Sequence, residues 1–277
     1  MAGSEVTVVV PTHARDEFLG EAIASVLAQE LAPAALIVSD DLGAPSTRAL
    51  VERWAARASF PVRYLDSSGP GAGTAGASRN AGAALVSTPL VAFLDDDDAW
   101  HPQFLARTVA ALGELDFVVA WIEPDDPGFT VPRMVEGLSA SEVVARNPGF
   151  VGSNFLMRTE RYRELEGFDP TLPVSNDKDL LVRALAAGAR YAVVPEGLVR
   201  YRVHSAGQLT DKTPRRAEGI RRYVSKHAEL LSPRDRRILA AQLASVERVA
   251  APSAVARFAS LVRLVLLRSW LKVTEAR

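Results

Sequence analysis

The residues with the most evident chemistry are four consecutive aspartates, Asp95 to Asp98, which directly follow the apolar run Leu90–Leu94. Adjacent like charges repel by roughly 1 kcal/mol per pair even in a water-like dielectric, so the cluster predicts a divalent cation. Oxygen ligands in a chain with no cysteine favour Mg²⁺ or Mn²⁺ over zinc. The alternative is a solvated acidic turn in which Asp98 caps the helix that opens near Pro102. The local pattern supports both interpretations equally.

A second acidic pair, Asp40 and Asp41, follows the apolar run Leu36–Val38. A carboxylate in this place can accept hydrogen bonds from a nucleobase or a ribose, as does the acid after the second strand of nucleotide-binding folds. The alternative is a cap for the helix that follows Pro45, shared with Ser46. Taken alone, the pair favours the cap.

The glycine-rich segment 69–76 precedes Arg79 and Asn80. No Gly-Lys-Ser/Thr follows it, so it is not a Walker P-loop, and a dinucleotide-binding loop would follow the first strand rather than the third. A turn is therefore the favoured interpretation of the glycines. Arg79 is more specific, because a guanidinium at a helix start near the acidic cluster could bind phosphate in a forked geometry.

Two later positions carry further chemistry. Asp177 precedes a helical pattern over Asp179–Ala187, where acids stabilise the helix dipole or, in the functional interpretation, provide a general base for an attacking hydroxyl. His204 ends an apolar strand and could be a metal ligand or a phosphate donor. A lone histidine of this kind is more often an ordinary surface residue.

Short apolar runs that predict strands alternate with helical patterns, and the candidate residues follow the strands. This alternation predicts a mainly parallel sheet flanked by helices on both faces, with ligands outside the carboxyl ends of the strands. The expected strands are 6–10, 36–38, 62–65, 90–94, 117–121, 155–157, 191–194 and 198–203, and the expected helices include 77–85, 102–112 and 179–187.

The composition is that of a folded globular chain, with 48% hydrophobic and 23% charged residues. The absence of cysteine excludes disulfides, thiolate metal sites and a cysteine nucleophile. The first residues do not resemble a signal peptide, which predicts a cytoplasmic location. The apolar stretch Val255–Val273 contains three arginines, which argues against a membrane-spanning helix and leaves peripheral contact at the inner face of the membrane open.

Charge divides the chain unevenly. Residues 212–277 carry 15 Lys and Arg against 5 Asp and Glu, and from Pro214 onward they show three helical patterns, which predict a basic helical appendage. No nucleic-acid-binding module accompanies the charge, so nucleic acid is not an expected partner. The tail is expected to pack or form a homodimer, with peripheral membrane contact as the alternative.

Taken in this order, the motifs resemble those of the family 2 glycosyltransferases with the GT-A fold. The similarity covers about residues 6 to 205, leaving the tail outside. The matching pieces are Val8–Thr12 with Arg15, Ser25–Gln29, Asp40–Asp41, Ser78–Gly82, Phe93–Asp98, Gly167–Asp169, Asn176–Asp177 and Tyr201–His204.

The resemblance implies an inverting transferase that uses a nucleotide-diphosphate sugar and a hydroxyl acceptor. Its GT-A domain would span 1–211, with a nucleotide-sugar half (1–122) and an acceptor half (123–211), followed by the helical region 212–277. It implies that Asp177 is the base and that the metal, Mg²⁺ or Mn²⁺, is held by Asp97 and His204. The implied donor contacts are Pro11, His13, Arg15, Asp41, Arg79, Asn80, Asp95 and Asp96, and the acceptor contacts are Asn154, Asn176 and Trp100.

The chain departs from the family pattern at three places: His13-Ala14 replaces the common Tyr-Asn, Leu42-Gly43 replaces Gly-Ser, and Asn176 replaces the Glu that often precedes the base. These departures affect recognition of the nucleobase more than the metal site and the proton transfer. One alternative function is a sugar-phosphate nucleotidyltransferase, whose glycine-rich loop should follow the first strand, where Pro11–Arg15 contains no glycine. The other is a catalytically silent carbohydrate-binding protein of the same fold.

Overall fold

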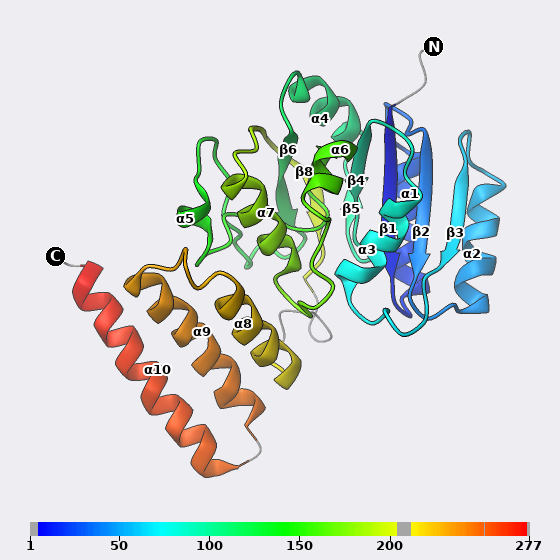
Figure 1. Cartoon of the computed structure of the whole chain (residues 1–277). Coiled ribbons are helices and arrows are strands. Elements are labelled where there is room, and N and C mark those ends of the chain that lie inside the picture. The colour runs from blue at the N-terminus through cyan, green and yellow to red at the C-terminus, as the bar shows by residue number, and fades with distance from the viewer. Residues whose placement is uncertain (1–4, 204–211, 252, 276–277) are drawn as a thin grey trace.

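The computed structural model describes residues 5–203, 212–251 and 253–275 (Figure 1). An eight-stranded sheet of order β3-β2-β1-β4-β7-β6-β8-β5 carries helices on both faces, and three further helices form a layer beside it. The strands are β1 (Val6–Thr12), β2 (Ala35–Asp40), β3 (Val62–Asp66), β4 (Leu90–Phe93), β5 (Ala99–Trp100), β6 (Phe117–Pro124), β7 (Phe155–Arg158) and β8 (Tyr191–Tyr201).

The helices of the α/β body are α1 (Asp16–Leu27), α2 (Pro45–Ala55), α3 (Ala75–Ala84), α4 (Phe104–Leu112), α5 (Ala140–Val143), α6 (Thr159–Glu164) and α7 (Asn176–Ala186). Alternate residues of β1 enter two different cores. Val8 and Val10 pack with α1, α2 and α4, whereas Val9 packs with α3, α6 and α7. A strand covered on both faces must be apolar throughout, which explains the unbroken valine run of β1.

The sheet is mixed. Strands β3, β2, β1 and β4 are parallel, as is the pair β6 and β8, while β7 is antiparallel to both of its neighbours and β5 is antiparallel to β8. The predicted fold class is therefore confirmed, with antiparallel strands added in the second half. Because β6 crosses the expected boundary between 1–122 and 123–211, the two proposed halves share one sheet.

The observed elements differ from the expected ones at β8, α7 and β5. β8 is one strand rather than two, because a register irregularity against β6 beside Trp121 accommodates the Pro195–Gly197 interruption. α7 begins at Asn176, three residues before the expected start. β5 has only two residues, which is too short to give a sequence pattern.

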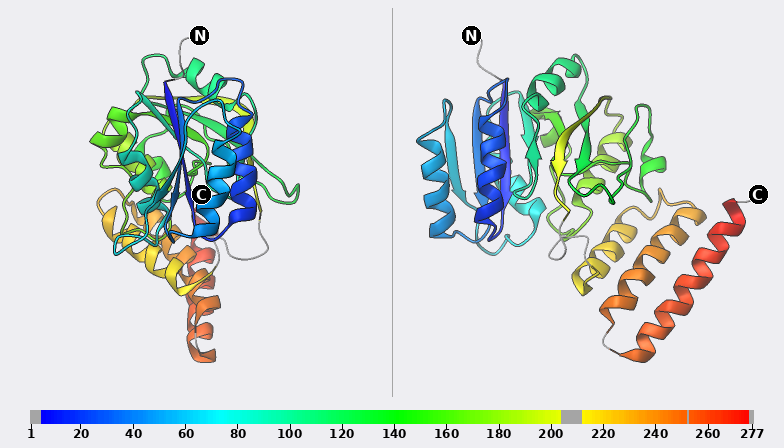
Figure 2. Two further views of the ribbon diagram at one scale, coloured as in Figure 1. Left: turned by 90° about the vertical axis from the view of Figure 1, so that its right-hand side faces the viewer. Right: turned by 180° about the vertical axis from the view of Figure 1, so that it is seen from behind.

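The three predicted C-terminal helices are confirmed as α8 (Pro214–Lys226), α9 (Pro233–Ala250) and α10 (Ala254–Glu275). They form a layer in which α8 lies next to the body, α9 follows, and α10 is outermost (Figure 2). Within the described ranges, no helix combines the length and the apolar character that crossing a membrane requires.

Candidate active site

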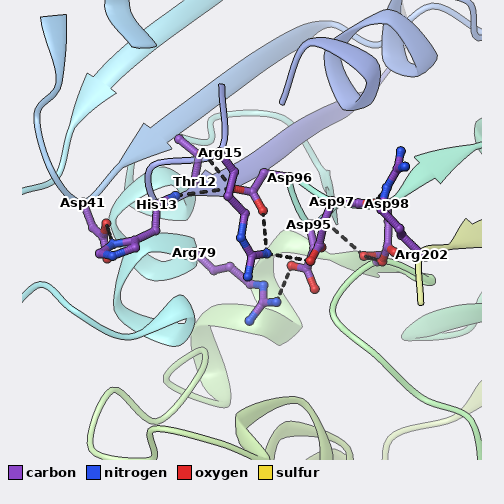
Figure 3. A network of polar contacts seen from close by, with 11 residues as sticks. Thr12, His13, Arg15, Asp41, Arg79, Asp95, Asp96, Asp97, Asp98 and Arg202 are labelled. Atoms are coloured by element: carbon purple, nitrogen blue, oxygen red, sulfur yellow. Dashed lines mark hydrogen bonds and ion pairs between the residues drawn. The ribbon is translucent and has the colours of Figure 1, made fainter. Parts of the chain in front are cut away.

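The four aspartates, here called the aspartate loop (Asp95–Asp98), lie just beyond the end of β4 and bond to residues from several distant segments of the chain (Figure 3). Asp96 accepts hydrogen bonds from Thr12 Oγ1 at 2.7 Å and from the His13 amide at 3.3 Å. Arg15 reaches Asp97 Oδ2 at 2.5 Å and Asp96 Oδ1 at 3.4 Å. The loop is thereby joined to the end of β1, as expected for the carboxyl edge of a parallel sheet.

Asp98 turns inward. It accepts hydrogen bonds from Ser153 Oγ at 2.5 Å and from the amide of Arg202 at 3.1 Å. The interpretation of Asp98 as a cap for the helix after Pro102 is wrong, because α4 begins at Phe104 after Gln103, and that cap position has no side-chain hydrogen bond.

The electrostatics of the loop show an excess of negative charge. Burial, followed by the charge of Asp97, raises the pKa of Asp96 to about 7 against the pull of Thr12 and Arg15. Burial, then the charges of Asp97 and Asp95, raises the pKa of Asp98 well above its ordinary range. The arginines on the loop therefore do not fully compensate its carboxylates, and further positive charge would be stabilised there.

The donor set suits a hard cation. Asp95 and Asp97 have the more accessible side chains, 28% and 17% exposed. No group of three or more acidic or histidine side chains is arranged around a metal position among the described residues. Mg²⁺ commonly takes only one or two carboxylates from a protein when substrate phosphates and water complete its shell, so the pair fits a cation that arrives with a phosphorylated substrate. The other predicted ligand, His204, lies outside the described residues.

His13 and Asp41 meet just beyond the ends of β1 and β2, where His13 Nδ1 lies 2.6 Å from Asp41 Oδ1 (Figure 3). The His13 side chain is 65% exposed, whereas that of Asp41 is 7% exposed, and Pro11 is buried in β1. The predicted base and ribose contacts thus lie together at the ends of β1 and β2. The imidazole presents an open surface there.

The neighbouring Asp40 has a structural role. It accepts hydrogen bonds from the amides of Leu42 and Ala44 at 3.0 and 2.7 Å and from the Tyr64 hydroxyl at 2.9 Å. These bonds shape the loop that leads into α2. The structural interpretation of the acidic pair therefore applies to Asp40, and Asp41 is the member that meets His13.

Arg79 connects the aspartate loop to the start of α7. Its guanidinium is paired with Asp95 and donates to Asn176 Oδ1 at 3.1 Å, and only 4% of the side chain is exposed. A Cβ at Gly152 would lie 2.2 Å from Arg79 Nη2 and 3.0 Å from Asp95 Oδ2, so this pair requires glycine at position 152. Segments separated by more than 80 residues are joined through one buried cation.

Asp177, next to Asn176, belongs to the same electrostatic site. Its Oδ1 accepts the amide of Lys178 at 2.7 Å. Burial raises the pKa of Asp177, the charge of Asp95 adds to that rise, and Arg79 opposes it. Ser175 turns the chain into α7 with a left-handed backbone, φ +61°, a conformation that is costly for a residue with a side chain.

The first turn of α7 is bound to α8. Asp179 is fully buried and lies 2.8 Å from His227 Nε2, from Lys226 Nζ and from Arg183 Nε; these four residues are called the Asp179 network. Burial acts against its ionisation, but the hydrogen bonds from His227 and Lys226, helped by Arg183, lower the pKa of Asp179 to about 2.

Lys178 adds a second contact between the same two helices. Its ammonium lies 4.1 Å from the ring centroid of Tyr223, and burial lowers the pKa of Lys178 to about 8. Sequence reasoning missed these residues of α8, and the one signal that could have pointed to an acidic partner in the body is the excess of basic residues after 212.

Residues 7–166 match the family model described as "Glycosyl transferase family 2". The chain belongs to glycosyltransferase family 2. Among curated proteins it is 31% identical over 220 residues to the succinoglycan biosynthesis protein ExoO of Rhizobium meliloti (strain 1021), covering 72% of this chain and 61% of that protein. It is 35% identical over 108 residues to a validoxylamine A glucosyltransferase of Streptomyces hygroscopicus subsp. limoneus, covering 38% of this chain and 23% of that protein.

Solved structures of this glycosyltransferase fold superimpose on the chain. The mannosyltransferase PcManGT of Pyrobaculum calidifontis, in complex with GDP-Man and Mn²⁺, gives a TM-score of 0.65 at 18% identity, covering 98% of this chain and 84% of that one. S. aureus TarS gives 0.62 at 19% identity, covering 89% and 44%. The chain thus spans less than two thirds of ExoO and of TarS. The comparisons support a glycosyltransferase rather than a nucleotidyltransferase.

Four predicted contacts of the glycosyltransferase site look different in the structure. Trp100 and Asn154 are 4% and 0% exposed, so they do not fit the predicted acceptor contact. Trp100 Nε1 donates to Ser153 O at 2.7 Å, and Asn154 bonds to the backbone of Ala120, Gly149 and Val151. Both residues position the loop that carries Ser153 beneath Asp98.

Asn80 and Asn176 also have their polar atoms engaged. Asn80 bonds to both backbone polar groups of Phe168 and to the Tyr162 hydroxyl, which favours a structural role over the predicted donor contact. Asn176 is 4% exposed and accepts from Arg79, so it orients the arginine rather than facing an acceptor. The sequence could not distinguish these roles, because the partners of both side chains lie more than 80 residues away and only the fold brings them near.

Proposed function

We propose that this glycosyltransferase moves a sugar from a nucleotide-diphosphate donor to an acceptor hydroxyl with inversion, and that Asp177 is the general base. The observation that carries the proposal is the position of Arg79, which contacts both Asp95 of the aspartate loop and Asn176 beside Asp177. It joins a phosphate-compatible edge of the sheet to a carboxylate whose pKa is raised by burial. A single base is sufficient for a single displacement.

We assign each group of residues a role from its position in the site. His13 with Asp41 would contact the nucleobase or ribose, and Arg15, whose side chain is 32% exposed, would hold the charge of the diphosphate. The buried Arg79 would orient Asp95 beside it. A bound Mg²⁺ or Mn²⁺, held by Asp97 with Asp95, would supply electrostatic stabilisation of the charge on the leaving diphosphate. Asp177 would accept the acceptor hydroxyl proton, for which a raised pKa is suitable.

The solved neighbours support the donor class. PcManGT has been solved in complex with GDP-Man and Mn²⁺, and TarS in complex with UDP-GlcNAc, so both bind nucleoside-diphosphate sugars. The acceptor we propose is a hydroxyl-bearing glycan, a lipid-linked glycan or a small natural product. The names of the relatives, a succinoglycan biosynthesis protein and a validoxylamine A glucosyltransferase, are compatible with this range.

A panel of UDP-, dTDP- and GDP-sugars tests the proposal through Mn²⁺-dependent thermal stabilisation, because a ligand that binds the native state raises its unfolding midpoint. We expect one nucleotide class to stabilise wild type and to lose that effect in Asp97→Asn. Stabilisation by none of them would contradict the proposal. Pyrophosphate release from a nucleoside triphosphate and a sugar phosphate would support the nucleotidyltransferase instead, and binding without hydrolysis or transfer would support the silent protein.

A further inference from the structure

The outer face of α10 is apolar and uncovered. On its inner side, Leu264 is buried against Ala241 and Ala244 of α9. On the outer side Phe258 is 67% exposed and Leu266 is 66% exposed. Figures 1 and 2 show α10 as the outermost helix of its layer, on the side away from the sheet. The other exposed apolar residues of the helix are Val255, Leu261, Val262 and Val265. Trp270 is 37% exposed, and Arg237 of α9 covers one side of its ring at 3.7 Å from the centroid.

Helical geometry arranges these residues as one stripe with charged borders. Val255, Phe258, Val262 and Leu266 are spaced three or four residues apart and share a face. At about 100° per residue, Arg257 and Arg268 lie along one edge of the stripe and Arg263 lies along the other. An apolar face with arginines at both margins is the pattern of a helix that lies in a membrane interface, where the apolar residues enter the acyl boundary and the arginines meet headgroups.

The charges favour an anionic surface over a second copy of the chain. Between Ala254 and Leu271 the helix contains three arginines and no acidic residue. Arg263 lies 3.9 Å from Glu247 of α9, and its side chain is still 54% exposed. Two such faces packed together would place arginines against arginines, which is repulsive, whereas anionic headgroups would neutralise them.

A pocket at one edge of the stripe is lined by polar residues and by the apolar Ile238, Ala241 and Leu271. Arg268 lines this pocket of about 260 Å³ together with Arg146 of the α/β body and with Gln242 and Ser245 of α9. Two guanidinium-bearing residues and two hydrogen-bonding side chains are suitable partners for a phosphate headgroup.

We propose that the outer face of α10 binds an anionic phospholipid surface peripherally, with Phe258, Val262 and Leu266 inserted and with Arg257, Arg263 and Arg268 on headgroups. This surface lies outside the residues assigned to sugar transfer. The contact is therefore independent of the donor and the base proposed above, and either proposal can fail without the other.

Flotation of the full chain with phosphatidylcholine vesicles, with and without phosphatidylglycerol, tests this contact. We expect binding only to the anionic vesicles and weaker binding at high salt. The double variant Phe258→Ser/Val262→Ser should lose it while unfolding at the wild-type temperature, because both side chains are solvent-exposed. Each change of Arg257 or Arg268 to Gln should weaken binding about fivefold.

Arg63→Gln, at an exposed arginine of β3, is the matched control and should bind like wild type. Absence of binding, equal binding to neutral vesicles, or binding kept by the Phe258→Ser/Val262→Ser variant would each overturn the proposal. So would light scattering that shows a dimer in wild type and a monomer in that variant, because the face would then be occupied by a second copy.

Discussion

Asp96 and Asp179 are both almost completely buried, yet their surroundings shift their pKa values in opposite directions. In the aspartate loop, Asp97 adds negative charge beside Asp96, and the pKa of Asp96 rises to about 7. In the Asp179 network, His227, Lys226 and Arg183 surround one carboxylate, and the pKa of Asp179 falls to about 2. The network is neutralised by the protein itself and supports the fold. The aspartate loop retains negative charge that the protein does not neutralise, which is typical of a site that binds a cation or another ligand.

The largest effect should come from Asp177→Asn, which removes the proposed base and keeps the side-chain shape. We expect the turnover rate to fall about 10²- to 10⁴-fold, the usual contribution of a general base. Donor-induced thermal stabilisation should remain near that of wild type, since Asp177 is not placed on the donor. Transfer rates and melting curves on the same samples measure both quantities.

Asp179→Asn, two residues further along α7, is the matched comparison. Removing one partner of a buried ion pair costs about 3 kcal/mol or more, so the urea midpoint should fall clearly. Transfer per folded molecule should decline much less than in Asp177→Asn. If instead Asp179→Asn abolished transfer in folded protein and Asp177→Asn did not, the base and structural assignments would have to be exchanged.

Gly152→Ala tests whether Arg79 and Asp95 must pack so closely. The added Cβ would collide with the guanidinium, and overpacking of this kind costs about 1–3 kcal/mol. We expect weaker donor binding, seen as a raised KM for the nucleotide sugar. Gly71→Ala is the control, because no heavy atom lies within 4 Å of a Cβ there; equal effects of the two variants would contradict the packing argument.

The smallest expected effect is the pH dependence of stability, and it tests the comparison of Asp96 with Asp179 most directly. The pKa of Asp96 is raised from 3.8 to about 7, so its ionisation opposes folding fully above pH 7, and this cost disappears as the pH falls toward 3.8. Asp179, with its lowered pKa of about 2, stabilises the fold above its ordinary value and loses that contribution as the pH falls toward 2.

Melting temperatures of Asp96→Asn and Asp179→Asn, each relative to wild type, should therefore have opposite trends. The Asp96→Asn difference should become more favourable to the variant as the pH rises from about 4 to about 8. The Asp179→Asn deficit should shrink as the medium becomes more acidic. Parallel trends would show that the two carboxylates do not differ as described.

Much of the arrangement was predictable because strand periodicity and the carboxyl-edge rule act locally. The apolar runs of β1, β2 and β4 indicate where Asp41 and the aspartate loop gather, and the family resemblance named Asp177. Side-chain direction was not predictable. Trp100 lies in β5, Asn80 lies within α3 and Asn154 directly precedes β7. Each one bonds to backbone groups that are distant in sequence and that only the folded chain brings near.

The packing of α8 against α7 also could not be predicted from the sequence. Its basic residues have the spacing of any amphipathic helix, and nothing in that spacing identifies Asp179 as the partner of Lys226 and His227. Such a pairing over roughly 50 residues depends on how α8 packs against α7, and packing between separate elements leaves no local periodic signal.

The contacts between α7 and α8, here called the α7–α8 joint, limit where the C-terminal helices of this enzyme can be exchanged for those of another. A chimera that exchanged everything after residue 211 for the tail of another glycosyltransferase would leave Asp179 with Arg183 alone and would remove Tyr223 from Lys178. The buried charges beside Asp177 would then lose their partners. A crossover placed between α8 and α9 keeps that joint intact and is the better position for grafting a new targeting segment.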